Sequence, residues 1–117
     1  MTVSQAISKA DELRPNPVST STKVDYLNEI NAQLSESMGV DMPDKLTQAS
    51  TTELLMPYPY DQVYVFYLTA MIDNALEEFA LFNNDMALYN QAVHEALAWW
   101  RRHHKKPSIN AIRGVYH

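Results

Sequence analysis

The chain has 117 residues, of which 46% are apolar and 20% charged, and its formal net charge is −5. This length suits one domain with a modest core, and the composition is ordinary for a globular protein. The absence of cysteine excludes disulfides and thiolate metal sites. We expect no membrane span and no signal peptide, because no apolar run is long enough and the first residues lack the required pattern.

The first two predicted helices lie in the first third of the chain. Thr2 and Gln5 have the spacing of a capping box, and apolar residues then recur at helical spacing. Arg14 ends this helix because a residue that precedes proline avoids the helical region. A second helix follows the Ser/Thr cluster at residues 19–22 and ends at Gly39, which suits a left-handed stop.

Residues 40–57 show no sustained apolar period, and we interpret them as a long connection. A loop of this length in a small domain is usually functional or disordered. A short strand or an extra turn within it is an alternative interpretation. This loop is also a candidate assembly element.

Two further helices are predicted after the loop. The third begins near residues 59–61, and its buried stripe extends to Phe79 and Phe82, with the acids Asp73, Glu77 and Glu78 mostly on the other face. Asn83-Asn84 is predicted to break it, with Asn84 or Asp85 capping a fourth, antiparallel helix that runs to about residue 104.

The fold class that we expect is therefore all-α. It is a bundle of about four helices over residues 1–104, with a long loop at about 40–57. A basic, extended C-terminal arm follows at residues 105–117. The scarcity of glycine, with only two residues, disfavours sandwiches and barrels, which need many turns.

The aromatic residues of the chain point to an interface. Four tyrosines at positions 58–67 cannot all face inward with their hydroxyl groups satisfied, and Tyr is favoured at interfaces. The adjacent Trp99 and Trp100 lie about 100° apart around a helix, so one is predicted in the core and the other nearer the surface. An exposed Trp beside Arg is typical of a binding hot spot. The predicted subunit interface comprises Tyr58, Tyr60, Tyr64 and Trp99.

Charge is distributed unevenly along the chain. Residues 1–100 hold all 14 acidic residues and four basic ones, which leaves −10, whereas residues 101–117 hold five basic residues and no acidic one. Such a tail suggests a negatively charged partner, although a solvated terminus has the same composition. Clustered cations also suit nucleic acid, but the body is acidic and lacks a basic recognition helix.

Few residue patterns in the chain indicate catalysis or metal binding. We predict no catalytic residues, no cofactor and no metal site. His94-Glu95 lacks the second His of a zinc-protease helix, because Ala98 stands there. His103 and His104 are adjacent and point to different sides of a helix, so they would not chelate one metal ion well. A metal enzyme built on Asp73 and Glu77, at i and i+4, is a third hypothesis, but the paired Glu-x-x-His motifs of di-iron bundles are absent.

Residues 54–104 nevertheless contain a set of motifs that, taken together, is specific. They begin with Leu-Leu-x-Pro-x-Pro-Tyr-Asp and continue with Ala70-x-Ile72-Asp73, Asn83-Asn84, Tyr89-Asn90 and an aromatic pair before Arg102. This stretch resembles the head–tail connector, or adaptor (head-completion), proteins of long-tailed phages and prophages of Gram-positive bacteria. The first helix, with its Asp-Glu-Leu-Arg-Pro turn, is similar as well. Residues 40–52 and 105–117 match no motif of the family.

The resemblance implies a structural virion protein without catalysis. Such adaptors form a ring, commonly of twelve copies, beneath the portal protein at the neck of the virion, after assembly in the host cytoplasm. The ring completes the head and meets a stopper or tail-completion protein. It extends the channel through which double-stranded DNA passes without sequence-specific binding, and no membrane is involved. The alternative is a small helical DNA-binding or regulatory protein that uses the basic tail.

The C-terminal segments of the adaptor family commonly reach the portal. The resemblance therefore suggests a portal-binding arm near the end of this chain. Its candidate residues are Arg101, Arg102, Lys105, Lys106, Pro107, Ile109, Ile112, Arg113, Val115 and Tyr116.

Overall fold

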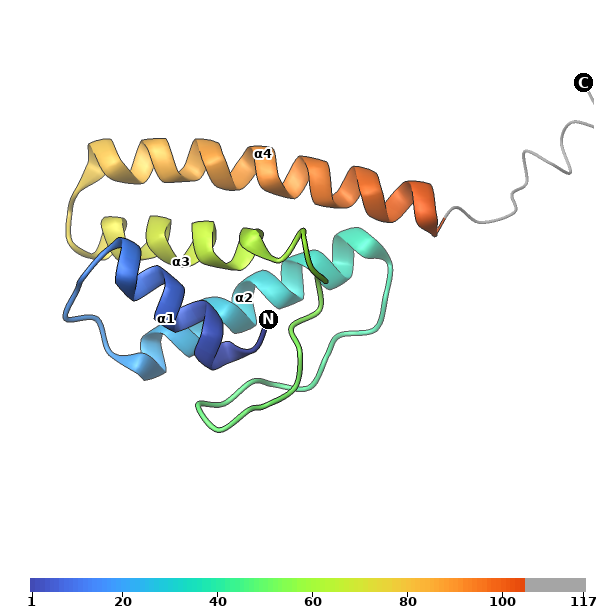
Figure 1. The fold of residues 1–117 in the computed structure, drawn as a ribbon, viewed down its shortest axis with the longest axis horizontal. Helices are drawn as coiled ribbons and strands as arrows, with labels where there is room; N and C mark the ends of the chain where they lie inside the picture. The colour runs from blue at the N-terminus through green and yellow to red at the C-terminus, as the bar shows by residue number, and fades with distance from the viewer. Residues whose placement is uncertain (105–117) are drawn as a thin grey trace, which may run out of the picture.

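The structure is a computed structural model that describes residues 1–104, so the predicted arm at residues 105–117 lies outside the described part. Its four helices are α1 (Val3–Leu13), α2 (Thr20–Met38), α3 (Gln62–Ala75) and α4 (Phe79–His103). α3 lies in the middle, with α1 and α2 on one side and the antiparallel α4 on the other (Figure 1). The all-α bundle with a long loop between its second and third helices is confirmed.

The ends of α1 and α2 follow the predicted signals. Thr2 accepts a hydrogen bond from the Gln5 N–H (3.3 Å) and donates its own N–H to the Gln5 side chain (2.9 Å), which completes the capping box. Ser19 caps α2 by accepting from the Thr22 N–H (3.2 Å). Gly39 closes α2 with a φ of 70°, a left-handed conformation that glycine adopts without steric cost.

α3 supplies the centre of the core. It is buried along most of its length because it packs against all three other helices. The apolar stripe of α2 faces it, as the predicted helical spacing requires. The largest fully buried side chains include Tyr64, Leu27, Ile30, Leu34, Met56, Leu68 and Ile72.

The predicted break between the third and fourth helices is wrong in position. α3 ends at Ala75, and the chain reverses over residues 76–78, where Glu77 takes a left-handed φ of 60°. Asn83 and Asn84 therefore lie inside α4. The low helix propensity of asparagine is a weak preference, and packing further along the helix overrides it.

This shift of the break corrects several further predictions. Phe79 and Phe82 belong to α4 instead of the buried stripe of α3, and Phe79 is exposed. Asp85 caps no helix, because it is a buried residue within α4. Asp73, predicted on the outer face of the third helix, is fully buried. The sequence pattern misplaced these residues because their positions depend on a contact from α1.

That contact is made by Arg14, the residue after α1. Its Nε donates to Asp73 Oδ1 (2.6 Å) at the end of α3, and its Nη2 donates to Asp85 Oδ2 (2.7 Å) on α4. A buried carboxylate is costly unless a cation and hydrogen bonds compensate it, and Arg14 compensates two. One side chain thus joins α1, α3 and α4.

The two carboxylates affect each other's protonation. As a carboxylate, Asp73 leaves Oδ2 buried without a hydrogen-bond partner among residues 1–104. Burial, and next a hydrogen bond with Asp85, raise the pKa of Asp73 from 3.8 to about 6, against the opposing effect of Arg14. A proton on Asp73 lets it donate to Asp85, so the raised pKa agrees with the unpaired oxygen.

We predict that Arg14→Met lowers the free energy of unfolding by about 3 kcal/mol, because two buried carboxylates lose their cation. Urea denaturation at neutral pH measures this loss. Lys9→Met, an exposed change on α1, is the control and should have little effect. Equal stability of the two variants would show that the Arg14 contacts do not hold the bundle together.

We also predict that Asp73 makes stability depend on pH in an unusual direction. Its pKa is higher in the folded state than its ordinary value, so the folded protein binds more protons, and the free energy of unfolding contributed by Asp73 decreases as pH rises from about 4 to about 6. Urea denaturation of the wild type and of Asp73→Asn, at about pH 4.5 and about pH 7, measures the difference between them. A difference that does not change with pH contradicts the assignment.

Candidate functional site

The predicted interface residues gather near the end of α4, with one exception. Tyr60 stacks on Trp99, with ring centroids 5.0 Å apart. Tyr58, two residues earlier, is 83% exposed. Tyr64 is fully buried instead, and its hydroxyl accepts a hydrogen bond from the Met56 N–H (2.7 Å). Because its side chain faces the core, Tyr64 is removed from the predicted interface.

The two tryptophans of α4 have different contacts. Both are only partly buried, so the prediction that one would lie in the core is wrong. The Trp100 indole N–H donates to the Met38 carbonyl (3.1 Å), one of the carbonyls that α2 leaves unpaired at its C-terminus. Trp99 instead contacts the rings of Tyr60 and His103. Trp100 therefore fixes α4 to α2, and Trp99 contributes an aromatic face at the edge of the bundle.

Exposed cations adjoin these aromatic rings. Arg101 and Arg102 lie in the last turn of α4, where positive charge is favourable beside unpaired carbonyls. His103 and His104 each donate from Nδ1 to a carbonyl four residues earlier, at 2.9 and 3.2 Å. We call this region the α4-end surface, which comprises Tyr58, Tyr60, Trp99, Arg101 and Arg102. The other predicted arm residues lie beyond the described part of the chain.

The described residues do not support the hypothesis of a metal enzyme built on Asp73 and Glu77. Asp73 is engaged by Arg14, and Glu77 lies past the end of α3, so the two do not share a helix face as the metal-enzyme hypothesis requires. Within residues 1–104, no cluster of three or more His, Cys, Asp or Glu side chains could hold a metal ion. In the same part of the chain, no helix combines the length and the apolar character needed to cross a bilayer.

The long loop at residues 40–57 is irregular, with a turn at residues 48–49, but it is fastened to the body. Asn28 of α2 accepts the Leu46 N–H (2.8 Å) and donates to the Leu46 carbonyl (3.2 Å). The Leu54 N–H donates to the Met1 carbonyl (2.8 Å). Leu46, Leu54 and Met56 are buried. These contacts give the loop a defined path across α2.

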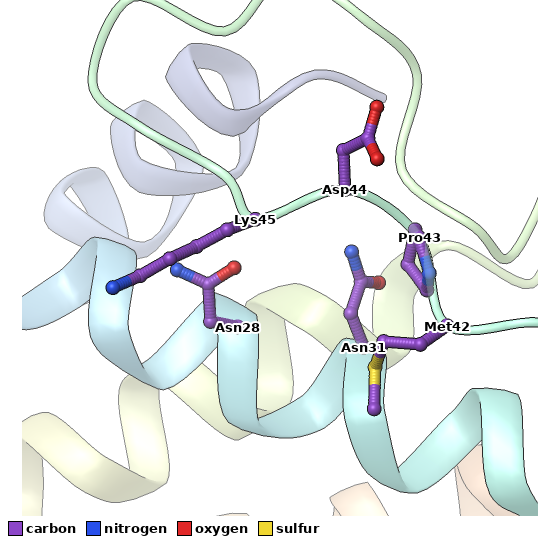
Figure 2. A pocket seen from close by; sticks show the side chains of 6 residues that line it. All are labelled: Asn28, Asn31, Met42, Pro43, Asp44 and Lys45. Atoms are coloured by element: carbon purple, nitrogen blue, oxygen red, sulfur yellow. The ribbon is translucent and has the colours of Figure 1, made fainter.

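A cavity of about 350 Å³ lies between α2 and the loop (Figure 2). Asn28 and Asn31 line it from α2, and residues 42–45 line it from the loop. A second cavity of about 430 Å³ shares Asn31 and residues 43–45 and extends to Ser50 and Glu53. Both volumes are at the lower end of the range for ligand pockets.

No prominent sequence signal marks this cavity. Its α2 residues are ordinary asparagines beside the apolar stripe, spaced i and i+3. That spacing places two polar side chains on one face, which was the available clue. The loop residues that complete the cavity come from a segment without any sequence period, so their position depends on the Asn28–Leu46 contact.

No match for the chain is found among protein families, curated proteins or solved structures. The resemblance to the adaptor proteins therefore rests on the motifs of residues 54–104 alone. The described residues offer two candidate binding sites, namely the α4-end surface and the cavity beside Asn31.

We predict that Asn28→Ala loosens the loop and lowers the free energy of unfolding by about 1–3 kcal/mol, because the buried Leu46 loses two hydrogen-bond partners. Hydrogen exchange at the Leu46 amide should become faster, and urea denaturation measures the loss of stability. Asn90→Ala, an exposed change on α4, is the matched control. Unchanged exchange at Leu46 would mean that other contacts hold the loop.

Proposed function

We propose that this chain is a structural virion protein, a head–tail connector that forms a ring between the portal and the next neck or tail protein. The observation that carries the proposal is the resemblance of residues 54–104 to the adaptor family. That resemblance implies a small helical body, and the described residues form one. The ring extends the DNA channel and completes the head.

A ring of identical copies requires two different contact surfaces on each copy, because each copy meets its neighbours head to tail. The two ends of α4 supply a pair of candidates. Its first part carries the exposed apolar side chains Phe79, Leu81 and Leu88, and its last part carries the α4-end surface. Leu88 and Trp99 are about 16 Å apart along the helix axis, so the two regions do not overlap. Exposed large apolar side chains often mark protein interfaces, which supports self-association.

The portal contact is assigned to the arm that starts at Arg101 and Arg102. Both cations are exposed where the described part of the chain ends, so they are available to a partner that binds the following residues. The acidic character of residues 1–100 suits a channel that must not bind passing DNA, because like charges repel phosphates.

The same two arginines favour a second candidate, a small helical DNA-binding or regulatory protein. Clustered cations displace counterions from phosphates, which gives salt-dependent affinity. An electrophoretic mobility shift with double-stranded DNA at moderate salt separates the candidates. A connector with an acidic body should give no shift there, whereas a DNA-binding tail should give one.

The decisive experiment is negative-stain microscopy of particles made when this gene carries a stop codon. We expect filled or DNA-leaking heads and free, unattached tails, because the neck cannot be completed. Wild-type protein supplied in trans should restore tailed particles. Trp99→Ser should restore them poorly because it removes the aromatic face of the α4-end surface, and the exposed change Gln91→Ala is the control.

Normal tailed particles without the protein would remove it from the connector and favour the regulatory candidate. Urea denaturation of purified Trp99→Ser protein separates a lost contact from a lost fold. If that variant is folded and restores tailed particles as well as Gln91→Ala does, the α4-end surface is not an assembly surface.

A further inference from the structure

Asn31 is a buried polar residue with an unused hydrogen-bonding group. The residue is 3% exposed, and its Oδ1 has no hydrogen-bond partner among residues 1–104. In Figure 2 the side chain points from α2 toward the loop near Pro43 and Asp44. Both cavities reach it. Buried amides are normally paired, so an unpaired one that faces a cavity indicates a missing partner.

The neighbouring Asn28 shows which partner this face of α2 binds. Its amide takes the N–H and the carbonyl of Leu46 together, so it pairs with an extended backbone through one donor and one acceptor. Asn31 is one turn further along the same face and presents the same amide group. The Ser35 hydroxyl lies 3.6 Å from Met42 Sδ, so the loop is close to α2 on both sides of Asn31.

The side chains that line the cavity indicate which residue types a bound partner should carry. Met42 and Pro43 supply apolar surface, and Asp44 and Lys45 supply one charge of each sign. Asp41, which precedes Met42, is exposed and adds a second negative charge. Within the described residues neither Asp41 nor Asp44 has an ion-pair partner. An extended peptide that carries apolar and basic side chains matches these walls.

We propose that the cavity beside Asn31 binds the backbone of the chain's own C-terminal segment, residues 105–117. This segment contains both required residue types, namely the cations Lys105, Lys106 and Arg113 and the apolar residues Ile109, Ile112 and Val115. Its positive charge complements Asp41 and Asp44. One backbone N–H and one carbonyl of the segment pair with the Asn31 amide, as Leu46 pairs with Asn28.

The position of α4 brings this segment within reach. Trp100 is bonded to the Met38 carbonyl, and Asn31 lies seven residues before Met38, about 10 Å along α2. Thirteen extended residues span up to about 40 Å, which covers this rise along α2 and also a path around the helix, whose diameter with side chains is about 10 Å. Because the segment is tethered, its effective concentration is about millimolar, so a modest intrinsic affinity suffices.

The inference does not depend on the connector function. It concerns the free chain and would hold equally for a regulatory protein. If the chain is a connector, the portal must draw residues 105–117 out of the cavity, and portal binding would then be stronger in a variant that cannot hold them.

The test is hydrogen exchange followed by mass spectrometry on the full chain. We expect the amides of residues 108–116 to exchange at least about tenfold more slowly than in a synthetic peptide of residues 105–117. Asn31→Leu should remove this protection, and Asn90→Leu, an exposed change on α4, should not. Because Asn31→Leu alters a buried site, a second variant changes Lys105, Lys106 and Arg113 to Glu and leaves the cavity intact.

Each outcome bears on the proposal. Loss of protection in both Asn31→Leu and the triple Glu variant supports it. Exchange of residues 108–116 at the free-peptide rate in the wild type overturns it and leaves the cavity to water. Protection that survives Asn31→Leu overturns it because the segment then binds elsewhere. Protection that appears only at concentrations where light scattering shows dimers overturns it in favour of a second copy.

Discussion

The pair of contacts from Arg14 to Asp73 and Asp85 determines where the last helix lies. Asp73 is in the final turn of α3, and Asp85 is in the second turn of α4. A single guanidinium can reach both only if the chain reverses tightly between them, so the cation and the reversal at residues 76–78 require each other. The end of α1 therefore does more than pack against the core. Arg14, which follows α1, orients the helix that carries the α4-end surface.

α2 has a comparable double role on the other side of the bundle. Its apolar stripe packs into the core against α3, whereas the adjacent polar stripe faces the loop. In that polar stripe, Asn28 holds the loop, and Asn31 Oδ1 has no hydrogen-bond partner within residues 1–104. The loop therefore covers this face of α2 except at the two cavities. Both cavities lie beside Asn31, whose amide the loop does not bind. Packing and recognition use neighbouring faces of one helix.

Local signals sufficed wherever one residue determines a backbone conformation. The capping box at Thr2, the stop before Pro15 and the left-handed Gly39 were all predictable, as was the helical spacing of the core. The reversal at Glu77 was not, because its left-handed conformation is unusual for this residue type and depends on Arg14 contacts distant in sequence. Tyr64 was misassigned because periodicity does not reveal that a hydroxyl finds a backbone partner in a loop.

The cavity could not be predicted for the same reason, since one of its walls has no sequence period. The α4-end surface was partly predictable, because aromatic and basic residues adjoin in the sequence, but the contact between Trp100 and α2 was visible only in three dimensions.

The two attachments of α4 also have a mechanical consequence. Asp85 fixes the helix near its start, and Trp100 fixes it near its end. A force applied at the end of α4 and directed along the helix axis would shear the α3–α4 contact and load many side chains at once. Peeling, which breaks contacts one after another, would need a force across the axis. A bundle loaded in this direction resists extension well, so tension applied at its C-terminal end is transmitted to α1 and α2 before the helices separate.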